Sequence, residues 1–211
     1  MIYQFELPFN FKTMKKKILE LISFKEWMDW RNEPWYKYIP LVTEDLENKS
    51  YNNFTKEGLL LQEYLLVWNL PIIKARISKT IYDGHWPSNR GWHRDEPLKY
   101  SVRIFIPVMN VRNSFIESEE FPPQKTRTGY GYTWNTGAMH RIFFKENCKK
   151  TERITFVIAL KADKIQNAEK WAKDFQKISK LYRKQRISEK KIINNITKIF
   201  LNNSGIKNKK E

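Results

Sequence analysis

Arg153-Ile154-Thr155-Phe156-Val157-Ile158-Ala159-Leu160 is the stretch that most clearly predicts a strand, because β-branched and aromatic residues fill most of it. Four more runs of this kind precede it, at residues 72–82, 100–109, 131–134 and 139–144. Turn-forming residues separate the runs, as in Asp83-Gly84 and Asn135-Thr136-Gly137. Residues 72–162 are therefore predicted to form a β-rich core.

Both ends of the chain show the three- and four-residue apolar spacing of amphipathic helices. At the N-terminal end it runs through residues 12–31 and 55–68. At the C-terminal end it runs through residues 165–181 and 192–200, and a frayed end is expected from Asn202. The sequence therefore predicts helices on both sides of the β-core.

These patterns predict one structural domain of three segments. They are an N-terminal helical buttress (1–71), the β-core (72–162) and a basic C-terminal helical extension with a frayed end (163–211). The predicted fold class is mainly β with flanking helices, as a β-sandwich or an open barrel.

The charge of the chain is strongly positive. Its 211 residues suffice for one domain with a substantial apolar core. The 39 Lys and Arg exceed the 23 Asp and Glu and give a net charge of +16, which attracts polyanions non-specifically. Residues 161–211 hold 15 basic and 5 acidic residues, a net of +10. A nucleic-acid surface remains open for this tail, but a solvated helix face is favoured because no groove-reading motif is present.

Cysteine and apolar content limit the cellular setting. Cys148 is the only cysteine, which excludes an intramolecular disulfide and a thiolate-rich zinc site. The longest apolar candidate for a membrane span, residues 59–73, is broken by Gln62 and Glu63, and residues 1–11 do not have the pattern of a secretory signal. We therefore expect a soluble cytoplasmic protein without a membrane partner, of unknown oligomeric state.

Two of the three histidines lie in a pattern that suits a metal site. In Trp92-His93-Arg94-Asp95, the two-residue step puts His93 and Asp95 on the same face of an extended segment. His140, on a separate strand-like segment, can supply a third ligand. Two histidines and one carboxylate on one triangular face suit non-haem Fe(II) and leave open positions. The alternatives are a loop ion pair for His93 and Asp95 and an edge-strand position for His140.

Arginines on the predicted strands suit an anionic ligand. Alternation puts Arg153 and Thr155 on one face of their strand, where they can bind the far carboxylate of a dicarboxylic acid. Arg103, in Val102-Arg103-Ile104-Phe105-Ile106-Pro107, is likewise surrounded by apolar residues. An arginine there is costly unless it meets an anion.

The order His93-x-Asp95, His140, Arg153 resembles the Fe(II)- and 2-oxoglutarate-dependent dioxygenases over residues 72–160. The likeness is greatest to the aspartyl/asparaginyl β-hydroxylase-like branch, because an arginine-bearing strand that ends in Pro107 follows the first histidine. The stretch from Trp134 through Asn-Thr-Gly to His140 adds to it. The resemblance implies a double-stranded β-helix of jelly-roll or cupin-like shape.

The same resemblance implies roles for the residues. His93, Asp95 and His140 would bind Fe(II), and Arg153, assisted by Thr155 or Arg103, would bind 2-oxoglutarate. With O2, the products would be succinate, CO2 and a hydroxylated substrate. Halogenating relatives replace the metal-binding carboxylate with a small residue, so Asp95 favours hydroxylation or a related oxidation.

The substrate class stays open at this stage. A small amino-acid-like or peptidyl substrate is favoured. An alkylated nucleobase is not favoured, because repair dioxygenases carry a second arginine six residues after the first, where this chain has Ala159. A non-catalytic cupin-like binding or structural module is the alternative from a different class.

Several residues near the motif have less specific interpretations. His85 has no acidic partner two residues on, so a surface position or the mouth of the pocket is expected for it. Trp86, Trp92 and Trp134 suit either the wall of a pocket or core packing. Cys148 has no neighbouring histidine to act as a base, so a nucleophilic role is not expected.

Overall fold

The computed structural model describes residues 2–161, except 31–32, 46–49, 69, 84–90, 96–99, 110–112 and 146–148. The helices are α1 (Phe11–Phe24), α2 (Lys56–Leu60) and α3 (Gln62–Leu66). The N-terminal strands are β1 (Tyr3–Glu6), β2 (Met28–Trp30), β3 (Glu33–Asp45) and β4 (Ser50–Phe54). The later strands are β5 (Ile72–Tyr82), β6 (Ser101–Met109), β7 (Ser114–Ser118), β8 (Phe121–Lys125), β9 (Tyr130–Thr133), β10 (His140–Phe144) and β11 (Thr151–Lys161).

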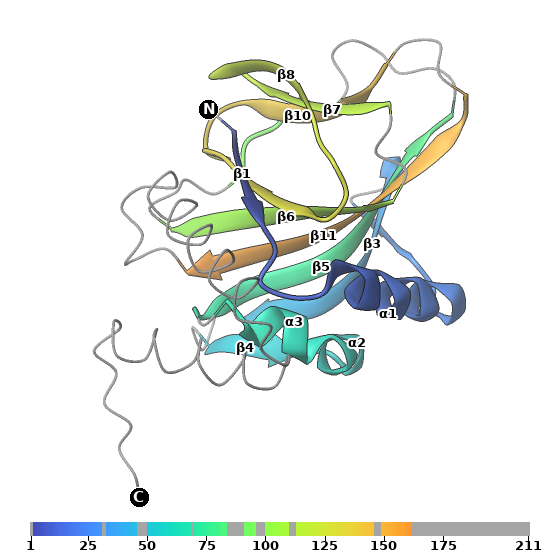
Figure 1. Ribbon diagram of the computed structural model, residues 1–211, viewed down its shortest axis with the longest axis vertical. Coiled ribbons are helices and arrows are strands. Elements are labelled where there is room, and N and C mark those ends of the chain that lie inside the picture. Colours follow the sequence, from blue (N-terminus) through green and yellow to red (C-terminus); the bar gives the residue numbers. More distant parts are fainter. Residues whose placement is uncertain are drawn as a thin grey trace, which may run out of the picture.

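Two antiparallel sheets and a layer of helices make up the described fold (Figure 1). The large sheet has the order β1-β9-β6-β11-β5-β3-β2, with β4 paired to β3, and the small sheet has the order β10-β7-β8. The helices cover the face of the large sheet that points away from the small sheet (Figure 1). The protein is therefore mainly β, with the double-stranded β-helix core predicted from the sequence.

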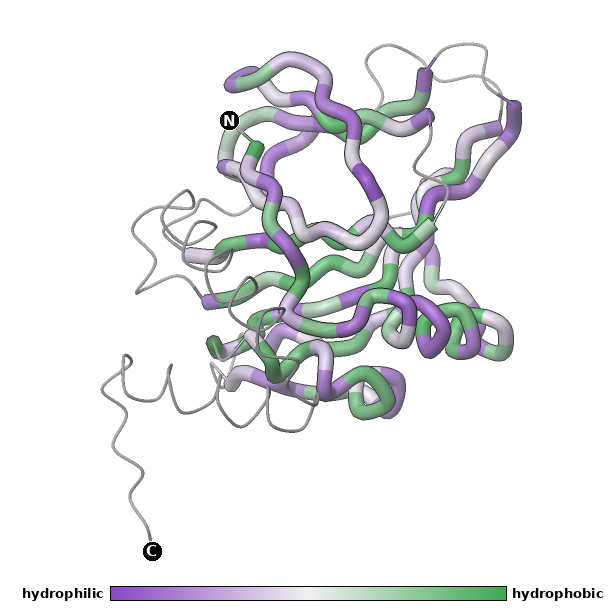
Figure 2. The backbone as a smooth tube through the Cα atoms, in the orientation of Figure 1, coloured by the Kyte–Doolittle hydropathy of each residue, from purple (hydrophilic) through white to green (hydrophobic). Residues whose placement is uncertain are grey.

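The central strands divide their side chains between two environments, because successive strand residues point to opposite faces. On β6, Ile104 and Ile106 belong to the core cluster that includes the helices, whereas Phe105 belongs to a second cluster with residues of the small sheet. On β11, Phe156 and Val157 are divided in the same way. Figure 2 shows long hydrophobic stretches along these strands. The face toward the small sheet is thus where polar residues such as Arg103 can gather.

Helix α1 illustrates how local sequence sets an element. The Asn10 side chain accepts hydrogen bonds from the backbone N–H groups of Lys12 and Thr13, which caps the first turn. Its buried residues Met14, Ile18 and Leu21 follow helical spacing and pack against the large sheet. The helix ends at Phe24, earlier than the predicted residue 31, because the chain becomes extended at Lys25 and continues into β2.

Residues 1–71 contain four strands that the sequence analysis did not predict. The longest, β3, pairs with β5 and extends the large sheet, and β2 pairs with β3. The strands β7 and β8 were also missed. Pro122 and Pro123 lie in β8, and an edge strand tolerates them because one of its sides needs no ladder hydrogen bonds. The three-segment division of the chain stays a prediction, and the predicted C-terminal helices lie outside the described residues.

In the part of the chain that the structure describes, no helix combines the length and apolar character needed to cross a membrane.

The predicted helix of residues 55–68 forms as two short helices, α2 and α3, separated at Leu61. Thr55 caps α2, since its hydroxyl accepts a hydrogen bond from the N–H of Gly58. Gly58 is buried against β3, and a Cβ atom placed there would lie 1.9 Å from the carbonyl oxygen of Leu41. Only glycine allows α2 to approach the large sheet this closely.

We predict that Gly58→Ala lowers the free energy of unfolding by about 2 kcal/mol, because the methyl group must displace the backbone of Leu41. Urea unfolding followed by circular dichroism measures the change. Lys56→Ala, at an exposed position of the same helix, is the matched control and should leave the midpoint nearly unchanged. Equal midpoints for the wild type and Gly58→Ala would contradict the close packing of α2 on β3.

Candidate metal centre

A backbone bridge brings the two predicted histidine ligands together. The N–H of His93 donates to the carbonyl of His140, and the N–H of His140 donates to the carbonyl of His93, both at 3.0 Å. The N–H of Asp95 donates to the carbonyl of Thr136 at 2.9 Å. The segment around His93 thereby lies along the edge of β10, and the two imidazole centroids are 4.4 Å apart.

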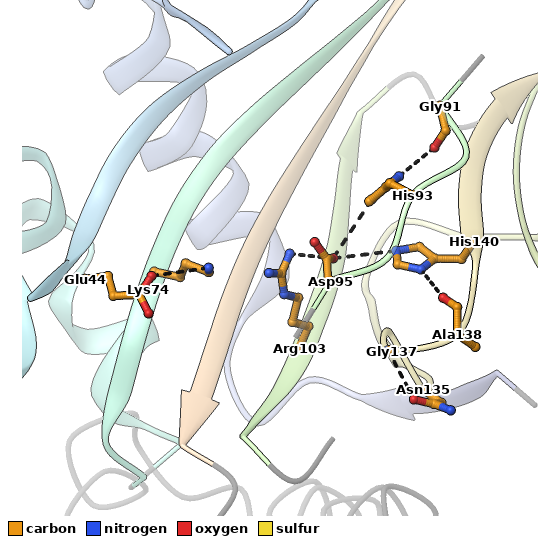
Figure 3. Close-up of polar contacts among 10 residues, drawn as sticks. All are labelled: Glu44, Lys74, Gly91, His93, Asp95, Arg103, Asn135, Gly137, Ala138 and His140. Carbon is orange, nitrogen blue, oxygen red and sulfur yellow. Dashed lines mark hydrogen bonds and ion pairs between the residues drawn. The ribbon is translucent and has the colours of Figure 1, made fainter. Parts of the chain in front are cut away.

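Hydrogen bonds fix the orientation of both imidazoles (Figure 3). The Nδ1 atom of His93 lies 2.6 Å from the carbonyl oxygen of Gly91, and that of His140 lies 2.9 Å from the carbonyl oxygen of Ala138. A carbonyl oxygen only accepts, so each Nδ1 atom carries the proton. In the neutral imidazole, Nε2 then has the lone pair, which is the form in which histidine binds a metal.

The three candidate ligands converge from three directions. The Oδ2 atom of Asp95 lies 3.6 Å from Nε2 of His140 and 4.0 Å from Nε2 of His93. All three ligand atoms lie within 4.8 Å of one another. Ligands at about 2.1 Å from a metal and about 90° apart lie about 3 Å from each other, so modest side-chain adjustments would bring these atoms onto one ion. The His-Asp-His triad could therefore bind a metal.

Arg103 provides the counter-charge for Asp95. Its Nη1 atom, almost fully buried, lies 2.5 Å from the Oδ2 atom of Asp95 (Figure 3). Burial raises the pKa of Asp95, but the contacts with His140, Arg103 and His93 outweigh it and hold the pKa well below its ordinary value. The carboxylate is thus ionised at neutral pH, as a metal ligand must be.

His93 is neutral at the same pH. Partial burial and the proximity of His140 lower its pKa, although Asp95 opposes this shift. Its side chain is half exposed, while that of His140 is buried and packs edge-on against Trp134. One side of the centre is therefore anchored in the protein interior and the other faces an opening.

The triad lies in a cavity of about 340 Å³ between the two sheets. Polar residues of β5 and β11, Ser78, Thr80 and Thr155, form one wall. Aromatic residues from β2 and β3 also line the cavity, namely Trp30, Trp35 and Tyr36. A volume of this size is at the lower end of the range for small-molecule sites.

Arg153 does not line the cavity itself, although Thr155, two residues further on β11, does. The side chain of Arg153 is fully buried, and its Nε and Nη2 atoms have no hydrogen-bond partner among the described residues. The hydroxyl of Thr155, on the same face of β11, also has none among them. Burial lowers the pKa of Arg153 to about 10, with Tyr36 and Tyr132 opposing the shift, so it remains charged at pH 7. Buried donors without partners are costly, and a bound carboxylate would satisfy them.

The structure thus brings the predicted site residues to one region. The cavity is lined by His93, Asp95, His140, Arg103 and Thr155, whereas Arg153 is fully buried and is not among the lining residues.

The aromatic residues proposed for the pocket divide between its wall and the core. Trp92 lines the cavity, whereas Trp134 is fully buried and stacks on Phe105 as part of the core. His85, Trp86 and Cys148 lie outside the described residues.

The sequence analysis missed four residues that line the cavity, Trp30, Trp35, Tyr36 and Arg76, three of which come from β2 and β3. Trp30 lies in the predicted helix of residues 12–31, and Trp35 and Tyr36 lie in the predicted N-terminal buttress, outside both of its predicted helices. The density of aromatic residues between positions 27 and 38 was the available signal. It could not be used without knowing that β3 joins the large sheet.

No protein-family model matches the sequence, and no curated protein matches it. Solved structures are similar in fold. A 2OG-Fe(II) oxygenase family oxidoreductase from Burkholderia pseudomallei matches with a TM-score of 0.54 at 11% identity, over 76% of this chain and 84% of that chain. HygX from Streptomyces hygroscopicus, with nickel and 2-oxoglutarate bound, matches with a TM-score of 0.47 at 11% identity, over 76% and 82% of the two chains.

A prolyl hydroxylase from Trichoplax adhaerens, in complex with a hypoxia-inducible-factor peptide fragment, matches with a TM-score of 0.47 at 12% identity, over 77% and 84% of the two chains. The assignment of the fold rests on the first of these three structures, whose TM-score is 0.54. The chain therefore has the fold of the 2OG-Fe(II) oxygenases, and its site must be judged on its own residues.

We predict that Asp95→Ala weakens binding of Co(II), a stand-in for Fe(II), by at least about 100-fold. Substitutions in the outer shell of metal sites cost about 10- to 100-fold, and the loss of a direct ligand should cost no less. Isothermal titration calorimetry measures the affinity. Glu20→Ala removes an exposed carboxylate on α1 and is the control. Equal affinity for Asp95→Ala and the wild type would show that the triad does not hold the ion.

We also predict that Arg103→Met lowers the free energy of unfolding of the metal-free protein by about 3 kcal/mol, because a buried carboxylate loses its counter-charge. Added Co(II) should stabilise this variant more than the wild type, since the ion replaces the guanidinium beside Asp95. Thermal unfolding with and without Co(II) provides the comparison. An equal metal-induced shift in both proteins would argue against ion binding at Asp95.

Proposed function

We propose that the protein is a non-haem Fe(II)- and 2-oxoglutarate-dependent dioxygenase that hydroxylates a C–H bond of a small amino-acid-like or peptidyl substrate. One observation carries the proposal: two imidazoles and one ionised carboxylate converge in a cavity between the sheets of a double-stranded β-helix. This set of ligands favours Fe(II) and leaves positions for further ligands.

The chain's own part in binding iron follows from the contacts of the triad. His93, Asp95 and His140 would hold the ion, with the proton of each imidazole fixed on Nδ1 by a backbone carbonyl. When bound, iron together with 2-oxoglutarate and O2 supplies an oxidant for C–H bonds, and the co-substrate is converted to succinate and CO2. Arg103 orients Asp95 and balances its charge.

Arg153 and Thr155 are the proposed ligands for the distal carboxylate of 2-oxoglutarate. Their buried donors have no partner among the described residues, and a carboxylate can accept from both side chains. Arg103 is proposed to assist near the metal, because it contacts Asp95 and lines the cavity.

Apolar side chains cover part of this region. Phe105, Ile142 and Val157 line the cavity, and the buried Trp134 stacks on Phe105 and packs against His140. A strong oxidant needs such cover, because water and exposed side chains would otherwise react with it.

The aspartyl/asparaginyl β-hydroxylase-like branch is the proposed place of the chain among these enzymes. Its support is the sequence resemblance at Arg103 and Pro107 and in the stretch from Trp134 to His140. A substrate with the size of an amino acid or a peptide side chain suits a cavity of about 340 Å³.

Anaerobic protein with Fe(II) and 2-oxoglutarate is expected to show a weak visible charge-transfer band that His140→Ala abolishes. In air, the wild type should form succinate, and mass spectrometry of candidate substrates should show the gain of one oxygen atom. A folded wild-type protein with no band and no succinate would refute the dioxygenase proposal and favour a non-catalytic module.

Arg153→Lys is expected to raise the 2-oxoglutarate concentration at half-maximal band intensity by at least about tenfold, because lysine cannot make a bidentate contact with a carboxylate. Arg127→Lys, at an exposed position between β8 and β9, is the control and should not change it. Circular dichroism confirms that each variant is folded. Unchanged half-saturation in a folded Arg153→Lys variant would assign the distal carboxylate to another residue.

A further inference from the structure

Arg76 is a cavity-lining cation that the proposed reaction does not use. It lies on β5, on the same face as Ser78 and Thr80, and its side chain is partly buried. The guanidinium carbon lies 4.9 Å from the ring centroid of Trp30 and 5.5 Å from that of Tyr36. Cation–π contacts of this kind hold a guanidinium in place and leave its N–H donors free to bind an anion.

Unlike Arg103 and Arg94, which also line the cavity, Arg76 has no carboxylate partner among the described residues. Arg103 pairs with Asp95 at 2.5 Å, and Arg94 lies 3.8 Å from Glu119. Among the described residues, no carboxylate forms an ion pair with Arg76. Glu33 also lines the cavity, where its carboxylate accepts a hydrogen bond from the indole N–H of Trp35. Arg76 therefore brings to this wall a positive charge that forms no ion pair with a carboxylate of the described residues.

Arg76 is also separated from the proposed 2-oxoglutarate ligands along the sheet. It lies opposite Val157, whereas Arg153 lies opposite Thr80. Thr80 lies four positions after Arg76 on β5, which corresponds to about 13 Å between their backbone positions. The two arginines therefore start from different rows of the sheet, and Tyr36 lies near the side chains of both.

We infer that Arg76 binds a carboxylate of the substrate, and that Trp30, Trp35 and Tyr36 pack against the apolar part of the same molecule. The inference rests on the proposed function, because it assigns the second anion site of the cavity to the molecule that is hydroxylated. It narrows the substrate class to organic acids with a free carboxylate, such as amino acids or the C-terminal residue of a peptide.

Binding to the full-length protein, loaded with Co(II) and 2-oxoglutarate, tests this inference. The probes are the twenty free amino acids, phenylacetate and indole-3-acetate, each paired with the analogue in which a carboxamide replaces the carboxylate, and calorimetry measures their affinities. At least one carboxylate should bind at least about tenfold more tightly than its amide, because a charged hydrogen bond is lost in the amide. Arg76→Gln should remove this preference, and Arg76→Lys should retain part of it.

The affinity for 2-oxoglutarate shows whether Arg76 binds the substrate or the co-substrate. It should stay within about twofold of the wild type in Arg76→Gln, since the co-substrate is assigned to Arg153 and a lost contact would cost about tenfold or more. Arg127→Gln, at an exposed position, is the matched control. A large loss of 2-oxoglutarate affinity in Arg76→Gln would overturn the inference by assigning Arg76 to the co-substrate.

Absence of any carboxylate preference, or the same preference in Arg76→Gln, would also overturn the inference. If the Fe(II)–2-oxoglutarate band forms while these results are obtained, only the role of Arg76 fails. If the band does not form in the folded wild type, the proposed function itself fails, whatever the probes show.

Discussion

The antiparallel bridge between His93 and His140 is the constraint on which the candidate centre depends. Two backbone hydrogen bonds of 3.0 Å hold together segments that are far apart in the chain, and the imidazoles come within 4.4 Å as a result. Asp95 is placed by a third backbone hydrogen bond, to Thr136. All three side chains are thus positioned by backbone pairing, which is more rigid than positioning by a free loop.

Charge compensation governs the rest of the cavity. Buried ionised groups are stable only when other charges or hydrogen bonds replace water. Asp95 satisfies this condition through Arg103, whereas the Nε and Nη2 atoms of Arg153 have no partner among the described residues. The contrast supports different proposed roles for the two arginines: Arg103 pairs with the carboxylate of the triad, and Arg153 is the proposed partner of the 2-oxoglutarate carboxylate.

Predictions from sequence were most accurate where the side-chain pattern alone determines the structure. The runs that became β5, β6 and β11 are rich in β-branched residues, so the central strands were predicted correctly. The edge strand β8 was missed because it contains Pro122 and Pro123, and β3 because its aromatic residues have no clear period. Edge and peripheral strands depend on a partner strand, and the sequence does not identify that partner.

By itself, the sequence determined the strand-forming core and the set of residues able to bind a metal, because alternation and residue chemistry are local properties. It placed His93 and Asp95 on the same face of one extended segment, and Arg153 and Thr155 on the same face of a separate strand. Only the tertiary structure decided that His140 meets that pair, that Arg103 contacts Asp95, and that Arg76 lies at an aromatic wall. The physical reason is that strand pairing over long separations sets these distances, and the energy of that pairing comes from the whole sheet and its packing.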